Sequence, residues 1–207
     1  MSASTPARIE CLILDLFGVL VAFDDSLVSE RIARQCRDPQ SALLRLTDVV
    51  SQPKLIRGEL TIEALHAQLV AELGLRPPLD DFLQLWRRSY SEPMPGMRDL
   101  LQRLQGRCRL VLLSNVDGCY WPTALAAVPE LGGFHARVLS FEQGVAKPQA
   151  EAFRRALDAA GTAIEHCFFV DDKAENIDAA AALGLRGHHF RDTRRLEHAL
   201  GQAGLAP

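Results

Sequence analysis

The sequence lacks the features that mark nucleic-acid-binding, membrane and disulfide-rich proteins. Its formal net charge is -3 and its pI is about 6.1, so composition gives no electrostatic case for binding nucleic acid or an anionic membrane. Its five cysteines form no C-x-x-C pair, which argues against a zinc or disulfide framework. Met1 to Arg8 is polar, and no apolar segment of signal-peptide length follows it. We therefore expect a cytoplasmic protein.

What the sequence does contain is an ordinary globular composition. Of its 207 residues, 48% are hydrophobic and 24% are charged, and this length is enough for a substantial core, or for a core with one insertion. The apolar run Cys11 to Leu14 is long enough for one buried strand and too short to span a membrane. It ends at Asp15, and Gly18 then lets the backbone turn. We expect small-molecule partners, and either a monomer or a homodimer.

The pattern of apolar residues divides the chain into two kinds of segment. Residues 25 to 90 carry helical spacing in four stretches, with no strand between them: Ser26–Cys36, Ser41–Val50, Thr61–Leu73 and Asp80–Tyr90. Residues 91 to 96 are expected to form a stiff linker, because they contain two prolines and a glycine. From Met97 onward helices and strands alternate, which is typical of crossover units and a parallel sheet.

These patterns predict an α/β fold. The expected architecture is a Rossmann-like three-layer α/β/α core with a parallel sheet and an inserted small helical bundle. The core should comprise residues 1–20 and 93–207, and the bundle residues 21–92. Helices are expected at 97–104, 118–128, 148–160, 174–183 and 193–202, and the later strands at 109–113, 137–139, 166–170 and 186–190. Pro148 is expected in the first turn of its helix.

Polar residues follow three of the expected strands. Asp15 follows the first, Ser114 and Asn115 follow the strand at 109–113, and Asp171 and Asp172 follow the strand at 166–170. Carboxyl ends of parallel strands open onto one crevice, where three carboxylates repel one another unless a cation binds. Oxygen ligands favour Mg²⁺. This hypothesis requires Asp15 and Asp171 to lie close together, with no basic side chain filling the space between them.

Further residues are suited to binding a phosphate at the same crevice. Lys147 precedes a helix in a loop that should open on this side, where its ammonium would neutralise both Asp15 and a phosphate. Ser114 and the amide of Asn115 are short donors for phosphate oxygens. These residues also have alternative roles. Asp15 and the Ser114–Asn115 pair could be turn residues, Asp171 and Asp172 could cap the next helix, and Lys147 could be an ordinary solvated lysine.

Four short motifs in this order resemble those of the haloacid dehalogenase superfamily. They are Asp15 to Leu20, Leu112 to Asn115, Lys147-Pro148, and Val170 to Asp172 with Asn176. The chain is similar to the branch of small sugar-phosphate phosphatases that includes alpha-D-glucose-1-phosphate phosphatase, and its helical insertion lies where the superfamily carries a cap of the first type. The resemblance implies a phosphatase that acts through an aspartyl-phosphate on Asp15.

The resemblance also implies the ligands of the metal and the contacts of the phosphate. Mg²⁺ would be held by Asp15, by the backbone carbonyl of Phe17 and by Asp171, with Asp172 acting through water or behind the ligands. Ser114 and Lys147 would hold the phosphoryl group. The implied substrate is a small phosphorylated metabolite.

Phe17 departs from the usual phosphatase pattern, in which a second aspartate protonates the leaving oxygen and later activates water. General acid catalysis typically contributes about 10²- to 10⁴-fold, so a substrate with a good leaving group is expected, such as a sugar 1-phosphate. An aromatic residue at this position is common in 2-haloacid dehalogenases, which work without metal. The alternatives are therefore a dehalogenase-like hydrolase and a non-catalytic binding protein.

Overall fold

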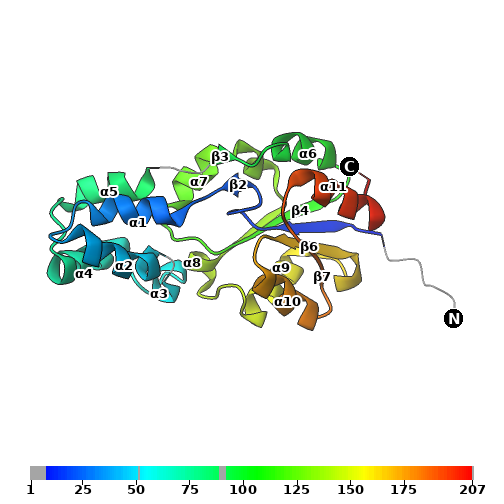
Figure 1. Ribbon diagram of the computed structural model, residues 1–207. Helices are drawn as coiled ribbons and strands as arrows, with labels where there is room; N and C mark the ends of the chain where they lie inside the picture. The colour runs from blue at the N-terminus through cyan, green and yellow to red at the C-terminus, as the bar shows by residue number, and fades with distance from the viewer. Residues whose placement is uncertain (1–7, 51, 89–91, 207) are drawn as a thin grey trace.

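A five-stranded parallel sheet organises the structure, a computed structural model that describes residues 8–50, 52–88 and 92–206 (Figure 1). The strand order is β5-β4-β1-β6-β7. The strands are β1 Cys11–Leu14, β4 Arg109–Ser114, β5 Ala136–Leu139, β6 Cys167–Asp171 and β7 Arg186–His189. Strand β1 is central, because it pairs with β4 on one side and β6 on the other. The expected α/β fold is confirmed.

Helices cover both faces of this sheet. On one face Cys11, Ile13 and Phe169 pack against helices α9 Ala150–Ala160 and α10 Ala174–Ala182. On the other face Leu12, Leu14 and their neighbours pack against α6 Met97–Leu104 and α11 Thr193–Gln202. Because successive side chains of β1 point to opposite faces of the sheet, this strand contributes to two separate hydrophobic clusters. Three layers result, as the alternating pattern predicted.

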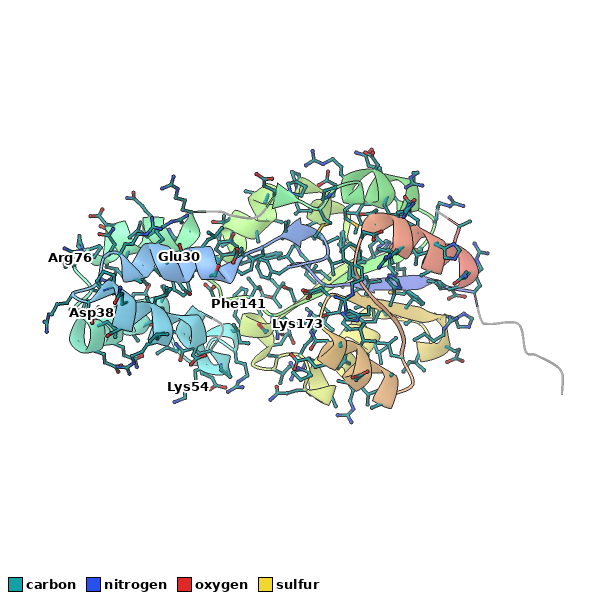
Figure 2. The ribbon with its side chains drawn as sticks, viewed as in Figure 1. Glu30, Asp38, Lys54, Arg76, Phe141 and Lys173 are labelled. Atoms are coloured by element: carbon teal, nitrogen blue, oxygen red, sulfur yellow. The ribbon has the colours of Figure 1, made fainter. Side chains whose placement is uncertain are left out.

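Five helices between β1 and β4 form a group beside the sheet (Figure 1). They are α1 Asp25–Ala33, α2 Pro39–Val50, α3 Pro53–Ile56, α4 Ile62–Leu73 and α5 Leu79–Arg87, and we call them the helical group. Phe82 and Trp86 are fully or nearly fully buried within it. Charged residues such as Asp38, Lys54 and Arg76 lie exposed on its surface (Figure 2).

The helical group differs from the sequence prediction in two details. Helix α3 was not expected, because four residues are too few to show helical periodicity. Residues 92 and 93, expected in the linker, instead form strand β3 Glu92–Pro93, which pairs antiparallel with β2 Val21–Ala22. This short ribbon joins the chain entering the helical group to the chain leaving it. Tyr90 and Ser91 lie outside the described residues.

Other boundaries moved by a few residues. Pro148 precedes α9 by two residues rather than standing in its first turn, and the Lys147–Pro148 peptide bond is cis. Helix α7 covers Trp121–Ala127, and two short elements not expected from the sequence surround β5, η1 Pro129–Gly133 and α8 Ser140–Gln143. A further turn, η2 Ile164–His166, precedes β6.

The structure also describes the cysteines and the apolar character of the helices. All five cysteines are free, and Cys11, Cys108 and Cys167 are buried among core residues. Within the described part of the chain, no helix has both the length and the apolar character needed to cross a bilayer.

Candidate active site

The ends of β1, β4 and β6 bring the predicted acids together. Leu14 lies beside both Leu112 and Val170 in the sheet register, so the residues that follow these strands are neighbours. Carboxylate oxygens of Asp15, Asp171 and Asp172 all lie within 4.8 Å of one another. The sheet thus creates the three-acid cluster from segments that are more than 150 residues apart in sequence.

Lys147 lies between two of these acids. Its Nζ is 2.7 Å from Asp15 Oδ1 and 2.7 Å from Asp171 Oδ2, and its side chain is 1% exposed. The expectation that no basic side chain separates Asp15 from Asp171 is therefore wrong on this side of the cluster. The lysine contacts Asp15 Oδ1 and Asp171 Oδ2, and Asp171 Oδ1 accepts two hydrogen bonds. The oxygens with the most remaining capacity for a metal ion are therefore Asp15 Oδ2 and those of Asp172.

Burial and charge act on this group in opposite directions. Burial raises the pKa of Asp15 to about 7, although Lys147 opposes the rise. Burial also favours the neutral form of Asp171, but Lys147 and the hydrogen bonds to its carboxylate outweigh it and lower its pKa. For Lys147, the two carboxylates outweigh burial and raise the pKa. The charged forms of Lys147 and Asp171 are thus favoured, whereas burial favours the neutral form of Asp15.

Asp172 supports the assignment of a cation site. Its Oδ1 is buried and has no hydrogen-bond partner among the described residues. Burial, and then the charge of Asp171, raise the pKa of its carboxyl group. The carboxyl groups of Asp15 and Asp172 both have raised pKa values, and one oxygen of Asp172 has no partner among the described residues. A divalent cation would stabilise the charged forms of these groups. The donor set therefore fits Mg²⁺, which prefers oxygen ligands.

Gly18 allows the two acidic loops to approach each other. Its φ angle is +76°, and a Cβ atom at this position would collide with the Asp172 carboxylate. Glycine is thus required both by the backbone conformation and by the space that Asp172 occupies.

Asn176 and Asn115 hold the surrounding loops. Asn176 Nδ2 donates to Asp171 Oδ1 at 2.8 Å, and the Lys173 amide donates to the same oxygen at 2.9 Å. Asn115 and Lys147 bond reciprocally, because Asn115 Nδ2 donates to the Lys147 carbonyl and the Lys147 amide donates to Asn115 Oδ1, each at 2.9 Å. The side chain of Asn115 therefore positions Lys147.

Ser114 lies deeper than the other predicted phosphate ligands. It is 1% exposed, and its Oγ has no hydrogen-bond partner within the described part of the chain. Asn115 and Lys147 line the cavity described below, whereas Ser114 is not part of its wall.

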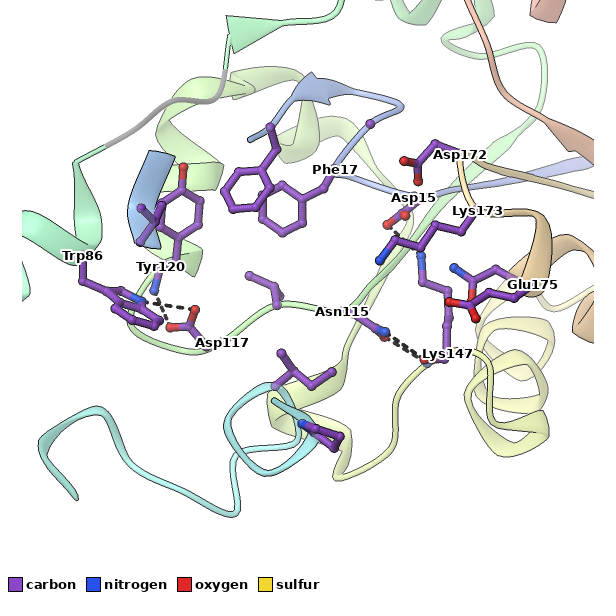
Figure 3. Close-up of a pocket in the computed structure, with 17 residues that line it drawn as sticks. Asp15, Phe17, Trp86, Asn115, Asp117, Tyr120, Lys147, Asp172, Lys173 and Glu175 are labelled. Atoms are coloured by element: carbon purple, nitrogen blue, oxygen red, sulfur yellow. Dashed lines mark hydrogen bonds and ion pairs between the residues drawn. The ribbon is translucent and has the colours of Figure 1, made fainter. Parts of the chain in front are cut away.

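A cavity of about 480 Å³ opens from the acidic cluster toward the helical group (Figure 3). We call its two sides the polar end and the apolar end. The polar end consists of Asp15, Asn115, Lys147, Asp172, Lys173 and Glu175. The apolar end is formed mainly by Phe17, Phe23, Val28, Ile56, Trp86 and Tyr120. The volume is typical of sites for small molecules.

Several of these residues were not found from the sequence. Lys173 and Glu175 follow the paired acids directly, so their position in the motif was an available signal. Phe23 and Trp86 carried no such signal, because they come from ordinary apolar positions in and beside the helical group. Tyr120, in the loop after β4, also lies in the cavity wall.

Asp117 links the sheet to the helical group at the apolar end. Its Oδ1 accepts from the amides of Cys119 and Tyr120 at 2.9 Å each, and its Oδ2 accepts from Trp86 Nε1 at 3.3 Å. Burial raises the pKa of this carboxyl group despite these bonds. Both of its oxygens are therefore engaged in holding α5 and the loop after β4.

Comparisons with known proteins agree with this architecture. The model of the haloacid dehalogenase-like hydrolase family matches residues 9–184. The chain is 25% identical over 187 residues to the sesquiterpene phosphatase AstK of Aspergillus oryzae, covering 87% of this chain and 89% of that protein. It is 24% identical over 188 residues to a phosphatase of Mycobacterium tuberculosis, covering 87% and 86% respectively.

A solved structure extends the similarity to the fold. It is an enzyme of Bacteroides thetaiotaomicron in complex with magnesium and inorganic phosphate. The TM-score is 0.79 at 22% identity, with 92% of this chain and 98% of that chain covered. At this identity the likeness shows the fold alone.

Proposed function

Because the chain belongs to the haloacid dehalogenase-like hydrolase family, we propose that it is a magnesium-dependent phosphatase acting on a small phosphomonoester. The main support for this proposal is that Asp15, Asp171 and Asp172 have carboxylate oxygens within 4.8 Å of one another, next to the buried ammonium of Lys147. This combination provides a nucleophile, a cation site and a positive group for phosphate. Both named relatives are phosphatases, which supports the same reaction.

In the proposed mechanism Asp15 is the nucleophile. One of its carboxylate oxygens forms a bond to phosphorus while the ester P–O bond breaks, which gives an aspartyl-phosphate and an alkoxide. The alkoxide takes a proton from solvent water and leaves hydroxide, because Phe17 has no proton to give. A water molecule then attacks phosphorus and gives up a proton to that hydroxide, the bond to Asp15 breaks, and phosphate leaves with the carboxylate restored.

The other residues of the polar end assist this reaction. Lys147 attracts the phosphoryl oxygens and orients Asp15 through their ion pair. Asn115 keeps Lys147 in place, and Ser114 and the amide of Asn115 are the proposed donors to phosphate. When bound, Mg²⁺ would supply positive charge that shields the phosphate from the attacking carboxylate. Asp15, Asp171, Asp172 and the carbonyl of Phe17 are its proposed ligands.

We further propose that residues 21–92 act as a cap on a core formed by residues 1–20 and 93–207. Val28, Ile56 and Trp86 of the helical group line the cavity whose other end holds Asp15. Closure of such a cap excludes water and selects the substrate.

A sugar 1-phosphate as the substrate, which was expected from the sequence, has less support than the phosphatase activity itself. It rests on the absence of a general acid at Phe17, and this chemistry requires a stable leaving oxygen rather than a sugar as such. One named relative acts on a sesquiterpene, so the relatives lend the sugar no support.

The dehalogenase alternative fits the site less well. A cation on the nucleophile would blunt attack on carbon, whereas Asp171 and Asp172 join Asp15 in a set of oxygen donors suited to a cation. If the protein only bound a ligand, the buried carboxylate of Asp15 and its ion pair with Lys147 would have no catalytic role.

Phosphate release tests the proposal. With Mg²⁺, the protein should hydrolyse phosphomonoesters. EDTA should abolish the activity, and Asp15→Asn should lower kcat by at least about a thousandfold. Asp158→Asn is the matched control, because Asp158 is exposed on α9, and it should keep full activity. Metal-independent halide release from 2-haloacids, or phosphate release that survives Asp15→Asn, would contradict the proposal.

A further inference from the structure

Resting on the proposed phosphatase activity, we infer that the substrate is a phosphomonoester whose alcohol carries an apolar ring or hydrocarbon body rather than a sugar. The apolar end of the cavity faces the residues that are proposed to bind phosphate. Figure 3 shows Asp15, Lys147 and Asp172 on one side of this cavity and Tyr120 and Trp86 on the other.

Three aromatic rings form a continuous wall at the apolar end. The ring centroids of Phe17 and Phe23 are 4.5 Å apart, and Tyr120 lies 5.9 Å from Phe17 and 5.8 Å from Phe23. Phe17 and Phe23 are half-buried, so each keeps surface for a ligand. Rings at these spacings offer favourable tilted contacts to a further apolar ring. Val28 and Ile56 extend the same wall into the helical group.

Asp117 and Trp86 at this end are already hydrogen-bonded to each other. Asp117 is its only carboxylate among the described lining residues, and both of its oxygens accept hydrogen bonds from Trp86 and two backbone amides. The Trp86 N–H is thereby also used. A sugar seated here would lose water from its hydroxyls without gaining these groups as partners, and burying unpaired hydroxyls is unfavourable. An apolar body avoids this loss.

Phe17 connects the apolar wall with the proposed phosphate hydrolysis. It places a hydrocarbon ring two residues after the nucleophile, at the position where related phosphatases carry a second aspartate. The first contact beyond the phosphate is therefore apolar. An aryl phosphate would also satisfy the need for a stable leaving oxygen, because a phenolate departs without protonation more readily than an alkoxide.

Two matched pairs of substrates test the inference. Cyclohexylmethyl phosphate and glucose 6-phosphate both release a primary alcohol from a six-membered ring and differ chiefly in hydroxyl groups. 1-Naphthyl phosphate and glucose 1-phosphate both have better leaving groups. In each pair kcat/KM should favour the apolar member by about tenfold or more, chiefly through KM. The first pair isolates the apolar body, and the second repeats the contrast between substrates whose leaving oxygen needs less protonation.

Variants of Phe23 locate the effect in the cavity. Phe23→Ser should raise KM for cyclohexylmethyl phosphate by about tenfold and leave glucose 6-phosphate little changed, whereas Phe23→Leu should restore most of the preference. Phe134→Ser is the matched control, because Phe134 is also half-buried but does not line the cavity. It should leave the ratio of the two substrates unchanged.

Failure of the inference is distinguishable from failure of the proposed function. Asp15-dependent hydrolysis that favours glucose 6-phosphate over cyclohexylmethyl phosphate overturns the apolar substrate and leaves the phosphatase intact, whatever the second pair shows. A preference for the apolar members that Phe23→Ser does not reduce also overturns it. If no member of either pair is hydrolysed, the proposed function fails and the inference fails with it.

Discussion

The two ends of the cavity come from different parts of the chain and follow different rules. The polar end consists of residues at strand ends and in the loops beside them, such as Asp15 after β1 and Asp172 after β6. The apolar end combines Phe23, Val28 and Trp86 from in and beside the helical group with Tyr120 from the sheet side. The polar end contains paired charges, and their chemistry depends on which groups lie next to them. The other contains packed rings whose role depends on shape.

This difference predicts unequal tolerance to substitution. At the polar end a single change leaves a buried charge without its partner, which is strongly destabilising. At the apolar end a change alters contacts that several neighbours share. Variants at both ends, ordered by expected effect, test the comparison.

Lys147→Met should have the largest effect. It removes the cation that contacts Asp15 and Asp171 at 2.7 Å, so the free energy of unfolding should fall by about 3–5 kcal/mol without metal. Millimolar Mg²⁺ should restore part of this loss, because a bound cation again neutralises the carboxylates. Urea unfolding with and without Mg²⁺ measures both quantities.

Lys54→Met is the control for this variant, since Lys54 is exposed on α3. Its stability should stay within about 0.5 kcal/mol of the unaltered protein. Equal losses in the two variants would show that Lys147 is an ordinary lysine.

Gly18→Ala should have an intermediate effect. The new Cβ meets the Asp172 carboxylate and also strains a backbone at φ +76°. Gly144→Ala is the matched control, because its φ is +68° and its Cβ would meet nothing within 4 Å. Gly144→Ala should cost about 1–2 kcal/mol from the backbone alone. Gly18→Ala should cost more and should also weaken Mg²⁺ binding in calorimetric titration. If the two variants bind Mg²⁺ equally well, Asp172 does not contribute to the metal site.

Asp117→Asn should have the smallest effect. The asparagine oxygen can still accept from backbone amides, but the Trp86 N–H loses its partner, at a cost of about 1 kcal/mol. Burial raises the pKa of the Asp117 carboxyl group, so ionisation of this group destabilises the unaltered protein as pH rises from its ordinary pKa through the raised one. Asparagine has no such loss.

The stability difference between Asp117→Asn and the unaltered protein should therefore shrink as pH rises from 4 to 8. Thermal unfolding across this range measures it. A difference that grows with pH would mean that the charged carboxylate is stabilising. Activity should change less than in Lys147→Met, since Asp117 holds α5 and the loop after β4 rather than phosphate.

The sequence was sufficient for the sheet and for the acids at its edge. Strand β1 could be predicted because four apolar residues end abruptly at Asp15, and the same pattern recurs before Asp171. Parallel strands bring their carboxyl ends to one edge, so convergence of these acids followed from topology. Helix α11 and helix α6 matched their predicted bounds, because their apolar spacing is regular.

Other features depended on contacts distant in sequence. The β2–β3 ribbon pairs residues 21–22 with residues 92–93, and two-residue strands carry no periodicity. Lys147 was expected beside Asp15, but its bridge to Asp171 was not, because a loop's sequence does not give the direction of its side chain. The ring contact between Phe23 and Tyr120 joins residues 97 positions apart and has no local signal.

The amino-acid sequence by itself determined the α/β class, the sheet edge and the kinds of chemical group placed there, because strand patterns and short motifs are local. Only the tertiary structure decided which carboxylates share Lys147, that Asp172 retains an unpartnered oxygen, and that aromatic rings face the site. Those outcomes depend on the packing of segments that are remote in the chain. Packing is settled by shape and burial across the whole molecule rather than by any one stretch of residues.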